Sequence, residues 1–358
     1  MIIGIDAGCL VVNSEEQKSG LYRLAVNFLK SARELNKKNQ YWLFSFAPIE
    51  EKLLKDLGDN FKNIVARPKT GWLYFGLPIY LFFNRVDVFL SLSQSLPLLS
   101  FCPKTTVFHD LAFEKFPHLY SDRDEKRLRR ISRPAARKAD LIFAVSSATK
   151  KDLVRFYGVD RNKIMVVYEA AGEQFIPQTK KQISLVRKKY HLSGDYFLFV
   201  GSLKPTKNLA NIVKAFTRQA VANDQLVLVG AGKFKTASRR IKKLGFVKDI
   251  DLPALYSGAI GLIAPSVYEG FGLPWLEAMS CRCPVIASNT GSGPEVVGKT
   301  DLLVNPDDVD QIAVAIGRLK NKQFREKMAE QSLKQAKKFH WQKFSQTILD
   351  RLEAIKSL

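Results

Sequence analysis

Two glutamates on either side of a glycine-bearing segment are the most chemically informative residues of this sequence. Glu269 and Glu277 are separated by seven residues, which begin with the run 270–272, Gly-Phe-Gly. Glycines let a backbone approach a ligand closely. Pro274 is well placed to begin a helix, whose first turn would offer N–H groups and a positive dipole end to a phosphate or diphosphate. A phosphate repels acids. We therefore expect the glutamates to accept hydrogen bonds from the hydroxyls of a group that is attached to the phosphate, such as ribose or a sugar.

Each glutamate also has a simpler interpretation. Glu277 alone would complement the dipole at the start of a helix, and Glu269 alone would be a solvated loop acid. The two carboxylates together with the glycine loop favour a ligand site.

Short β-branched and aromatic runs alternate with helix-like segments, once in each half of the chain. The expected strands cover 2–6, 41–46, 86–90, 105–108, 141–145 and 164–168, then 196–200, 226–229, 259–264 and 284–287. This alternation predicts an α/β protein with two doubly wound parallel sheets, which bind ligands at the carboxyl ends of their strands. We expect domains at 1–172 and 173–340, a site in the cleft between them, and a final helix at 341–358 that packs back on the first domain.

The composition is that of an ordinary globular protein with a large excess of positive charge. The 358 residues are 46% hydrophobic and 25% charged, which excludes a disordered or collagen-like chain, and the formal net charge is +22. Four cysteines and four histidines are too few for a disulfide scaffold, and Cys281 and Cys283 lack partners for a metal site. The first six residues form an apolar run without a basic leader, so we interpret them as a buried strand. We expect a cytoplasmic, metal-free protein.

The positive charge requires an anionic partner, and two segments suggest a membrane surface. Basic residues cluster at 123–138 and 233–248, and an aromatic stretch at 71–83 is too short to span a bilayer. The first cluster is either a solvated helix face or a surface attracted to anionic lipids. The aromatic stretch is either a buried core element or a segment that enters the membrane interface. We expect peripheral docking on the inner face of the cytoplasmic membrane.

Two other function classes are disfavoured. Nucleic-acid binding would require a recognisable reading module or aromatic residues within the basic cluster at 123–138, and neither is present. A dinucleotide-dependent oxidoreductase is disfavoured because Asp6-Ala7-Gly8-Cys9, and not Gly-x-Gly-x-x-Gly, follows the first strand.

The sequence resembles the retaining glycosyltransferases of family 4, which have the GT-B fold. Residues 269–279 form a nearly complete Glu-Gly-Phe-Gly-Leu-Pro-x-x-Glu-Ala-Met block. Similar segments lie at 4–7, at 106–111 with a strand-end His-Asp, at 201–209 and at 245–249. The resemblance implies two Rossmann-like domains facing across a cleft, a nucleoside-diphosphate sugar as co-substrate, and no metal.

The family implies a role for each matching residue. Glu269 would contact the transferred sugar, Lys207 would neutralise the departing diphosphate, and His109 would line the cleft from the first domain. Glu277 would bind the ribose and Val247 the base, the latter through its backbone. The remaining donor-binding positions are Gly270, Phe271, Gly272, Leu273, Gly20, Lys204 and Ser202. A lone histidine after a strand is usually structural, and Lys207 has a simpler interpretation as a solvated residue at a helix start.

Three positions depart from the family pattern, and one of them is Tyr22, which stands in the first loop where a second glycine is common. Ser202 and Thr206 stand where many members carry arginine, so a bidentate phosphate clamp is missing. Lys204 lies on the same loop and is a candidate to compensate.

The sequence therefore predicts a metal-independent, retaining hexosyltransferase of surface-polysaccharide synthesis. The resemblance favours mannose from GDP-mannose as the donor and a glycan or lipid-linked acceptor. The alternative is a catalytically weakened glycosyltransferase-like subunit that binds a glycan or protein partner.

Overall fold

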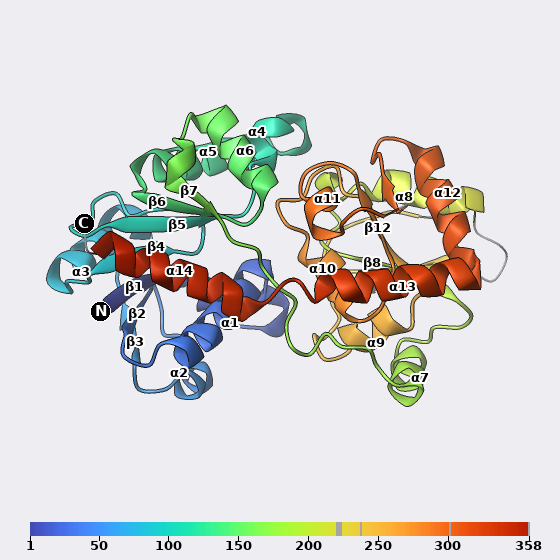
Figure 1. Cartoon of the computed structure of the whole chain (residues 1–358), viewed down its shortest axis with the longest axis horizontal. Coiled ribbons are helices and arrows are strands. Elements are labelled where there is room, and N and C mark those ends of the chain that lie inside the picture. Colours follow the sequence, from blue (N-terminus) through green and yellow to red (C-terminus); the bar gives the residue numbers. More distant parts are fainter. Residues whose placement is uncertain (220–223, 237, 301, 357–358) are drawn as a thin grey trace. The chain divides into compact units, whose positions relative to one another are not determined.

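The computed structural model describes residues 1–219, 224–236, 238–300 and 302–356, which form two compact units (Figure 1). Unit 1 comprises Met1–Glu169 and His340–Leu358, and unit 2 comprises Ala170–Phe339. The first division therefore falls at 169/170, close to the expected boundary at 172. The chain returns to unit 1 for its last helix.

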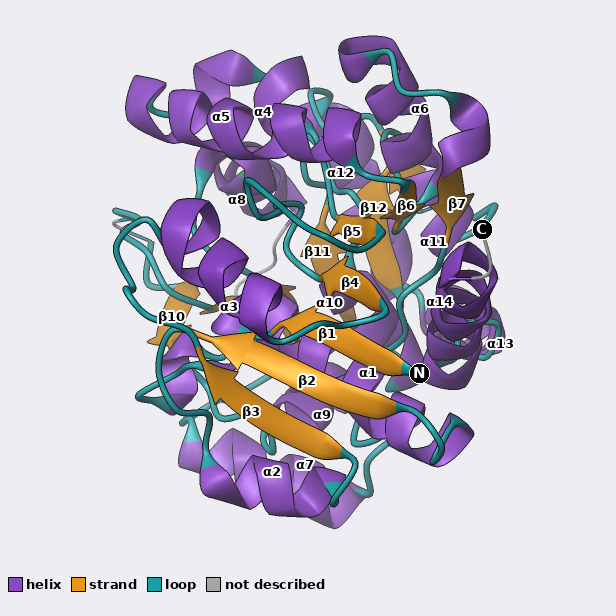
Figure 2. Ribbon diagram, turned by 90° about the vertical axis from the view of Figure 1, so that its left-hand side faces the viewer, coloured by secondary structure: helices purple, strands orange, loops and turns teal. Residues whose placement is uncertain are grey.

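Unit 1 is built on a seven-stranded sheet in which every paired strand is parallel to its neighbour, in the order β3-β2-β1-β4-β5-β6-β7. Figure 2 shows β1, β2 and β3 side by side in this sheet. The strands are β1 (Ile2–Asp6), β2 (Gln40–Ser45), β3 (Phe61–Val65), β4 (Val88–Ser91), β5 (Lys104–Phe108), β6 (Leu141–Ala144) and β7 (Ile164–Val166). The α-helices are α1 (Gly20–Leu35), α2 (Glu51–Leu57), α3 (Leu77–Phe83), α4 (Ala112–Lys115), α5 (Asp122–Lys138), α6 (Ser147–Tyr157) and α14 (Trp341–Lys356).

Unit 2 repeats this architecture with six parallel strands in the order β10-β9-β8-β11-β12-β13. The strands are β8 (Tyr196–Val200), β9 (Gln225–Val229), β10 (Ile241–Gly245), β11 (Gly261–Ala264), β12 (Val285–Ser288) and β13 (Leu303–Val304). The α-helices are α7 (Lys180–Lys189), α8 (Leu209–Gln219), α9 (Leu252–Ser257), α10 (Leu273–Ser280), α11 (Gly293–Val296), α12 (Val309–Lys320) and α13 (Lys322–Ala336).

The burial of the strands explains why they read as continuous apolar runs. All four residues of β4, β11 and β12 are buried, because helices cover both faces of each sheet. The helices contribute one apolar side each, as in α1, where Leu24, Phe28 and Leu29 recur at helical spacing and are buried. The α/β class with two parallel sheets is confirmed.

Three strands escaped the sequence analysis, and all lie at sheet edges. β3 and β10 carry the polar pairs Lys62-Asn63 and Lys242-Lys243, and β13 has only two residues. An edge strand is paired on one side only and tolerates exposed polar side chains, so it lacks the apolar signature of a central strand.

The aromatic stretch at 71–83 combines the two interpretations given above. It folds as a π-helical turn, η3 (Trp72–Gly76), followed by α3. Trp72, Leu77 and Leu81 are buried in the core of unit 1, whereas Phe75 and Phe83 are exposed. No helix in the described ranges is long and apolar enough to cross a membrane.

Candidate functional site

The loop that follows β11 is shaped by one glycine whose replacement would be strained. Gly272 has φ +95°, and a Cβ atom there would lie 2.2 Å from the Trp275 ring. That ring is fixed, because its indole N–H donates a hydrogen bond to the Ala264 carbonyl at 2.9 Å. Gly272 also precedes the first residue of α10, which begins at Leu273, one residue before the expected Pro274. The loop therefore enters the helix through a left-handed turn that glycine accommodates.

A buried serine orients the peptides of this loop. The Ser292 hydroxyl lies 3.0 Å from the Glu269 carbonyl oxygen and 2.8 Å from that of Phe271, and it has no exposed surface. In a trans peptide the C=O and the following N–H point in opposite directions. The N–H groups of Gly270 and Gly272 therefore point away from Ser292, and neither donates to another atom in the described part of the chain. Two aligned donors at the start of α10 suit an anionic oxygen.

Lys207 lies directly beside the first glutamate. Its Nζ atom is 2.5 Å from Glu269 Oε1, and the Ser266 hydroxyl donates to the same oxygen at 2.7 Å. Both charged side chains are partly shielded from solvent. The sequence-predicted Lys207 and Glu269 are thus brought together as an ion pair next to the glycine loop.

Asn208 fixes the backbone that carries Lys207. Asn208 has φ +59° and is buried, and its amide donates to the carbonyls of Pro265 at 3.0 Å and Pro306 at 2.6 Å. Asparagine tolerates the left-handed conformation better than most residues. The loop between β8 and α8 is thereby held against the loop after β11.

The second glutamate is buried in unit 2. Glu277 is 3% exposed, and the Tyr256 hydroxyl donates to its Oε2 atom at 3.0 Å. Tyr256 belongs to α9 and is itself fully buried. A buried carboxylate that accepts a hydrogen bond from a phenol is oriented for directional hydrogen bonding, not for attracting a mobile counter-ion.

The other predicted donor-side residues lie on neighbouring loops of unit 2. Val247 follows β10 and is buried, whereas the adjacent Phe246 keeps 39% of its surface exposed. Ser202 is half-buried and Lys204 is exposed on the loop after β8. Phe246 was not among the predicted site residues. Because its ring is exposed beside the buried Val247, it is a further candidate site residue of this loop.

In unit 1, His109 is engaged at both ring nitrogens. Nε2 lies 2.7 Å from the Leu92 carbonyl oxygen, and Nδ1 lies 3.5 Å from Oε1 of Glu169, which is 4% exposed. Burial lowers the pKa of His109, but the hydrogen bond and the charge of Glu169 outweigh it, so the pKa is raised. Two acceptors around one imidazole favour the doubly protonated ring, and His109 is therefore suited to act as a cation.

Asp6 and Gly20, two further residues of unit 1, give less specific information about the site. Asp6 ends β1 and is buried, and it accepts hydrogen bonds from the Ser93 hydroxyl at 3.0 Å and the Gly8 N–H at 3.1 Å. Burial raises its pKa. Gly20 begins α1 and is exposed.

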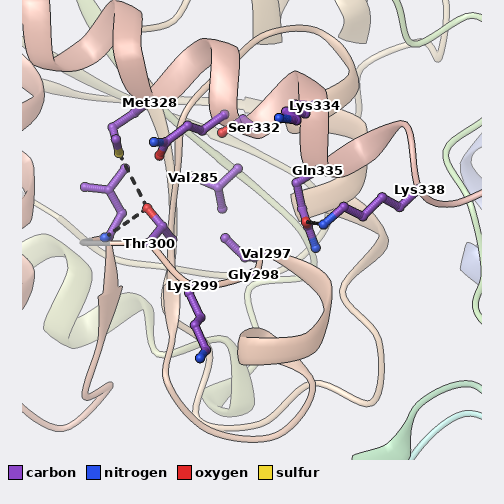
Figure 3. Close-up of a pocket in the computed structure, with 12 residues that line it drawn as sticks. Val285, Val297, Gly298, Lys299, Thr300, Met328, Ser332, Lys334, Gln335 and Lys338 are labelled. Carbon is purple, nitrogen blue, oxygen red and sulfur yellow. Dashed lines mark hydrogen bonds between the residues drawn. The ribbon is translucent and has the colours of Figure 1, made fainter.

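Figure 3 shows a cavity in unit 2 that none of the predicted site residues lines. Its volume is about 160 Å³, and Val285, Thr300 and Met328 lie among its walls. Lys338 at its rim is tied to Gln335 by a hydrogen bond of 2.7 Å. We assign this cavity no role in the site.

Several site residues were missed because their partners are remote in sequence. Ser292 lies more than twenty positions from the loop carbonyls it contacts, and Tyr256 lies equally far from Glu277 on α10. Glu169 lies sixty positions from His109. Glu169 had a readable signal, since it follows β7 as His109 follows β5, and parallel strands end at one edge. No group of three potential metal ligands occurs in the described ranges.

The fold and this loop arrangement define a GT-B protein, and comparison with known proteins specifies the family. Residues 59–170 match the family described as Glycosyltransferase Family 4, and residues 194–322 match Glycosyl transferases group 1. The chain belongs to the family 4 glycosyltransferases, as the sequence resemblance indicated.

Curated relatives point in the same direction. O-antigen chain mannosyltransferase B of Escherichia coli is 33% identical over an alignment of 253 residues, and the match covers 66% of this chain and 66% of that protein. The serotype-specific mannosyltransferase WbdA of the same species is 30% identical, and the match covers 57% of this chain but 27% of that protein. The O-antigen chain mannosyltransferase RfbU of Salmonella typhimurium is 24% identical over 85% of this chain and 90% of its own.

Solved structures agree on the fold over the whole length. Anabaena HepE in complex with UDP and glucose has a TM-score of 0.76 at 19% identity and covers 98% of this chain and 99% of its own. WaaG, a glycosyltransferase involved in lipopolysaccharide biosynthesis, has a TM-score of 0.74 at 13% identity, with coverage of 98% and 99%.

Proposed function

We propose that the protein transfers a hexose from a nucleoside-diphosphate sugar to a glycan or lipid-linked acceptor in surface-polysaccharide synthesis. Mannose from GDP-mannose is the favoured donor, because the curated relatives described above are named mannosyltransferases. The observation that carries the proposal is the Lys207–Glu269 pair beside the two aligned N–H groups of the loop before α10.

The chemistry follows from where charge develops. The bond between the anomeric carbon and the diphosphate oxygen breaks and leaves its electron pair on the diphosphate. The acceptor oxygen bonds to that carbon, and the proton of the acceptor hydroxyl passes to the departing diphosphate or to solvent. Negative charge accumulates on the leaving diphosphate, which the Gly270 and Gly272 amides, the start of α10 and Lys207 would stabilise. These groups supply the stabilisation without requiring a metal ion.

The roles of the remaining residues are part of the proposal. Glu277, positioned by Tyr256, would bind the ribose hydroxyls, and Glu269 would contact the transferred sugar. Val247 would contact the base, and the family resemblance implies that His109 acts as a cation toward the substrates. Retention of the anomeric configuration is proposed from the family resemblance.

The test is transfer by the purified protein from a panel of UDP-, GDP- and ADP-sugars, with Glu269→Ala and Lys207→Ala as controls. We expect turnover with GDP-mannose, and proton NMR of the first product reads its anomeric configuration. Turnover that requires an added divalent cation would contradict the proposed metal independence. A product of inverted anomeric configuration would contradict the proposed retention.

A second candidate rests on the two positions where the usual arginines are replaced. Ser202 and Thr206 leave the phosphate loop with fewer cations, as expected for a weakened, glycan-binding subunit. No turnover with any nucleotide sugar, combined with measurable glycan binding, would favour this alternative.

A further inference from the structure

The exposed side of η3 and α3 is apolar although it faces solvent. Phe75 and Phe83 are 62% and 76% exposed, and Phe101 on the nearby loop is 69% exposed. Large apolar side chains gathered at one place on a surface mark an interaction site. We call this surface the apolar face, and its members are Tyr74, Phe75, Ile79, Phe82, Phe83, Leu98, Leu99 and Phe101.

The apolar face is continuous across two segments. The Phe82 ring packs against the rings of Phe83 and Phe101, with centroids 5.3 Å and 5.2 Å apart. The Leu98 N–H donates to the Leu73 carbonyl at 2.9 Å, which fastens the loop to η3. Because the opposite side of α3 is buried in the core of unit 1, this face cannot turn inward.

Helix α5 carries two different sets of cations. Arg129 and Arg133 contact Glu114 at 3.0 Å and 3.3 Å, so their charges are compensated within the fold. Successive members of a second set are one, three or seven residues apart, and at 3.6 residues per turn these positions fall on one side of the helix. We call it the basic stripe, and it consists of Arg123, Lys126, Arg127, Arg130, Arg137 and Lys138.

The basic stripe is largely uncompensated. Its one ion pair in the described part of the chain joins Arg127 to Asp124 at 3.8 Å, between two exposed side chains. Exposed pairs of this length contribute little. The stripe therefore presents concentrated positive charge to solvent.

A pocket joins the apolar face to the basic stripe. It has a volume of about 270 Å³, with Leu73, Tyr74 and Leu98 on one side and Arg130 and Lys138 on the other. Ile131 and Pro134 complete its apolar wall. A cavity with apolar walls and two cations suits an amphiphile with an anionic head.

We propose that unit 1 docks on an anionic lipid bilayer through the apolar face and the basic stripe, and that the pocket holds one lipid by its phosphate. Aromatic side chains enter the boundary between headgroups and acyl chains, and the stripe lies over anionic headgroups. A second copy of the chain fits less well, because a symmetric interface on this face would bring two uncompensated basic stripes together.

The experiment is co-sedimentation of the full chain with vesicles of phosphatidylcholine alone or mixed with phosphatidylglycerol, at low and high salt. We expect binding to the mixed vesicles at low salt, weakened by salt and by Arg130→Gln with Lys138→Gln, by about fivefold for each charge removed. Phe82→Ser with Phe83→Ser should weaken it by about tenfold or more. Lys322→Gln with Lys327→Gln on α13 is the matched charge control and should change binding little.

Three results would overturn the inference: no binding to anionic vesicles at low salt, equal binding to both vesicle types, or loss of self-association as the sole effect of the phenylalanine variants. All substituted side chains are on the surface, and thermal melting verifies that each variant folds. Vesicle binding does not depend on the reaction proposed above. A protein that binds vesicles but transfers no sugar would contradict the proposed function and leave this inference standing.

Discussion

The Lys207 ammonium group lies 2.5 Å from Oε1 of Glu269, so the acid beside the glycine loop has its own counter-ion within unit 2. This pairing removes an apparent conflict in the sequence, where a carboxylate stands next to a predicted diphosphate site. A neutral pair repels a diphosphate less than a bare carboxylate does. The lysine is also close enough to the loop to respond to charge that develops there.

Replacing Lys207 should therefore affect the reaction more than the fold. Lys207→Ala removes one cation from the site and leaves Glu269 uncompensated, and we expect initial transfer rates to fall by roughly 10²–10³. Lys322→Ala, at an exposed position of α13, is the control. A rate within about twofold of wild type would exclude a role for Lys207 in the reaction.

Ser292→Ala tests whether the loop carbonyls must be held. The substitution removes the hydroxyl that contacts both carbonyls: the Phe271 carbonyl loses its contact of 2.8 Å, whereas the Glu269 carbonyl keeps the Ser292 N–H at 3.3 Å. The free energy of unfolding should fall by about 1–3 kcal/mol. Nucleotide affinity should fall by about tenfold because the Gly270 and Gly272 amides lose their alignment. Isothermal titration with nucleoside diphosphates and chemical denaturation measure the two effects.

Ser288→Ala is the matched control for that substitution. Ser288 is equally buried, but its hydroxyl has no hydrogen-bond partner among the described residues. Equal losses of nucleotide affinity in both variants would mean that the serine does not act through the loop.

Glu169→Gln should change the protonation of His109. Burial lowers the pKa of His109 and Glu169 is the main group that opposes this effect, so the pKa should fall from its raised value when the carboxylate is removed. In wild type, the stabilisation that the pair gives is complete at low pH and is lost as pH rises through the raised pKa. The stability difference between wild type and variant should therefore shrink with rising pH.

The measurement for this pair is the NMR titration of the His109 ring protons, with denaturation at several pH values. Glu173→Gln, an exposed site four residues further along, serves as the control. An unchanged His109 titration in Glu169→Gln would refute the assignment.

Tyr256→Phe tests the orientation of Glu277. Loss of the hydroxyl removes the hydrogen bond to Oε2, and we expect about a tenfold loss of nucleotide affinity, measured by titration with a nucleoside diphosphate. Tyr196→Phe is the comparison, because its buried hydroxyl donates at 2.7 Å to the Leu255 carbonyl. If both variants lose affinity equally, the effect belongs to packing around α9 and not to Glu277.

The sequence was most informative where structure depends on neighbours along the chain. The central strands are recognisable in the sequence as apolar runs. The block from Glu269 to Met279 contains the loop, its glycines and the start of the helix in one stretch. The π-helical turn and α3 were harder to predict, because their buried side and their exposed side both carry apolar residues. Periodicity distinguishes polar from apolar sides and carries no information when both are apolar.

What could not be predicted depends on contacts across the fold. The position of Glu169 after a strand indicates the sheet edge at which it lies, but only the strand order shows that its carboxylate reaches His109. The Ser292 hydroxyl reaches the loop carbonyls because α11 packs beside β12. Such pairings follow from strand order, which alternation alone does not specify.

The return of the chain to unit 1 determines when that unit can be complete. α14 packs on α1, with Phe344 against Phe28 at a ring-centroid distance of 6.3 Å, and Asn36 on this side of unit 1 donates to Glu353 at 3.1 Å. During synthesis, the ribosome must translate α14, up to Lys356, before this apolar side of α1 can be covered. Unit 2, although second in the chain, has all of its residues in one stretch and is therefore the first that can finish folding.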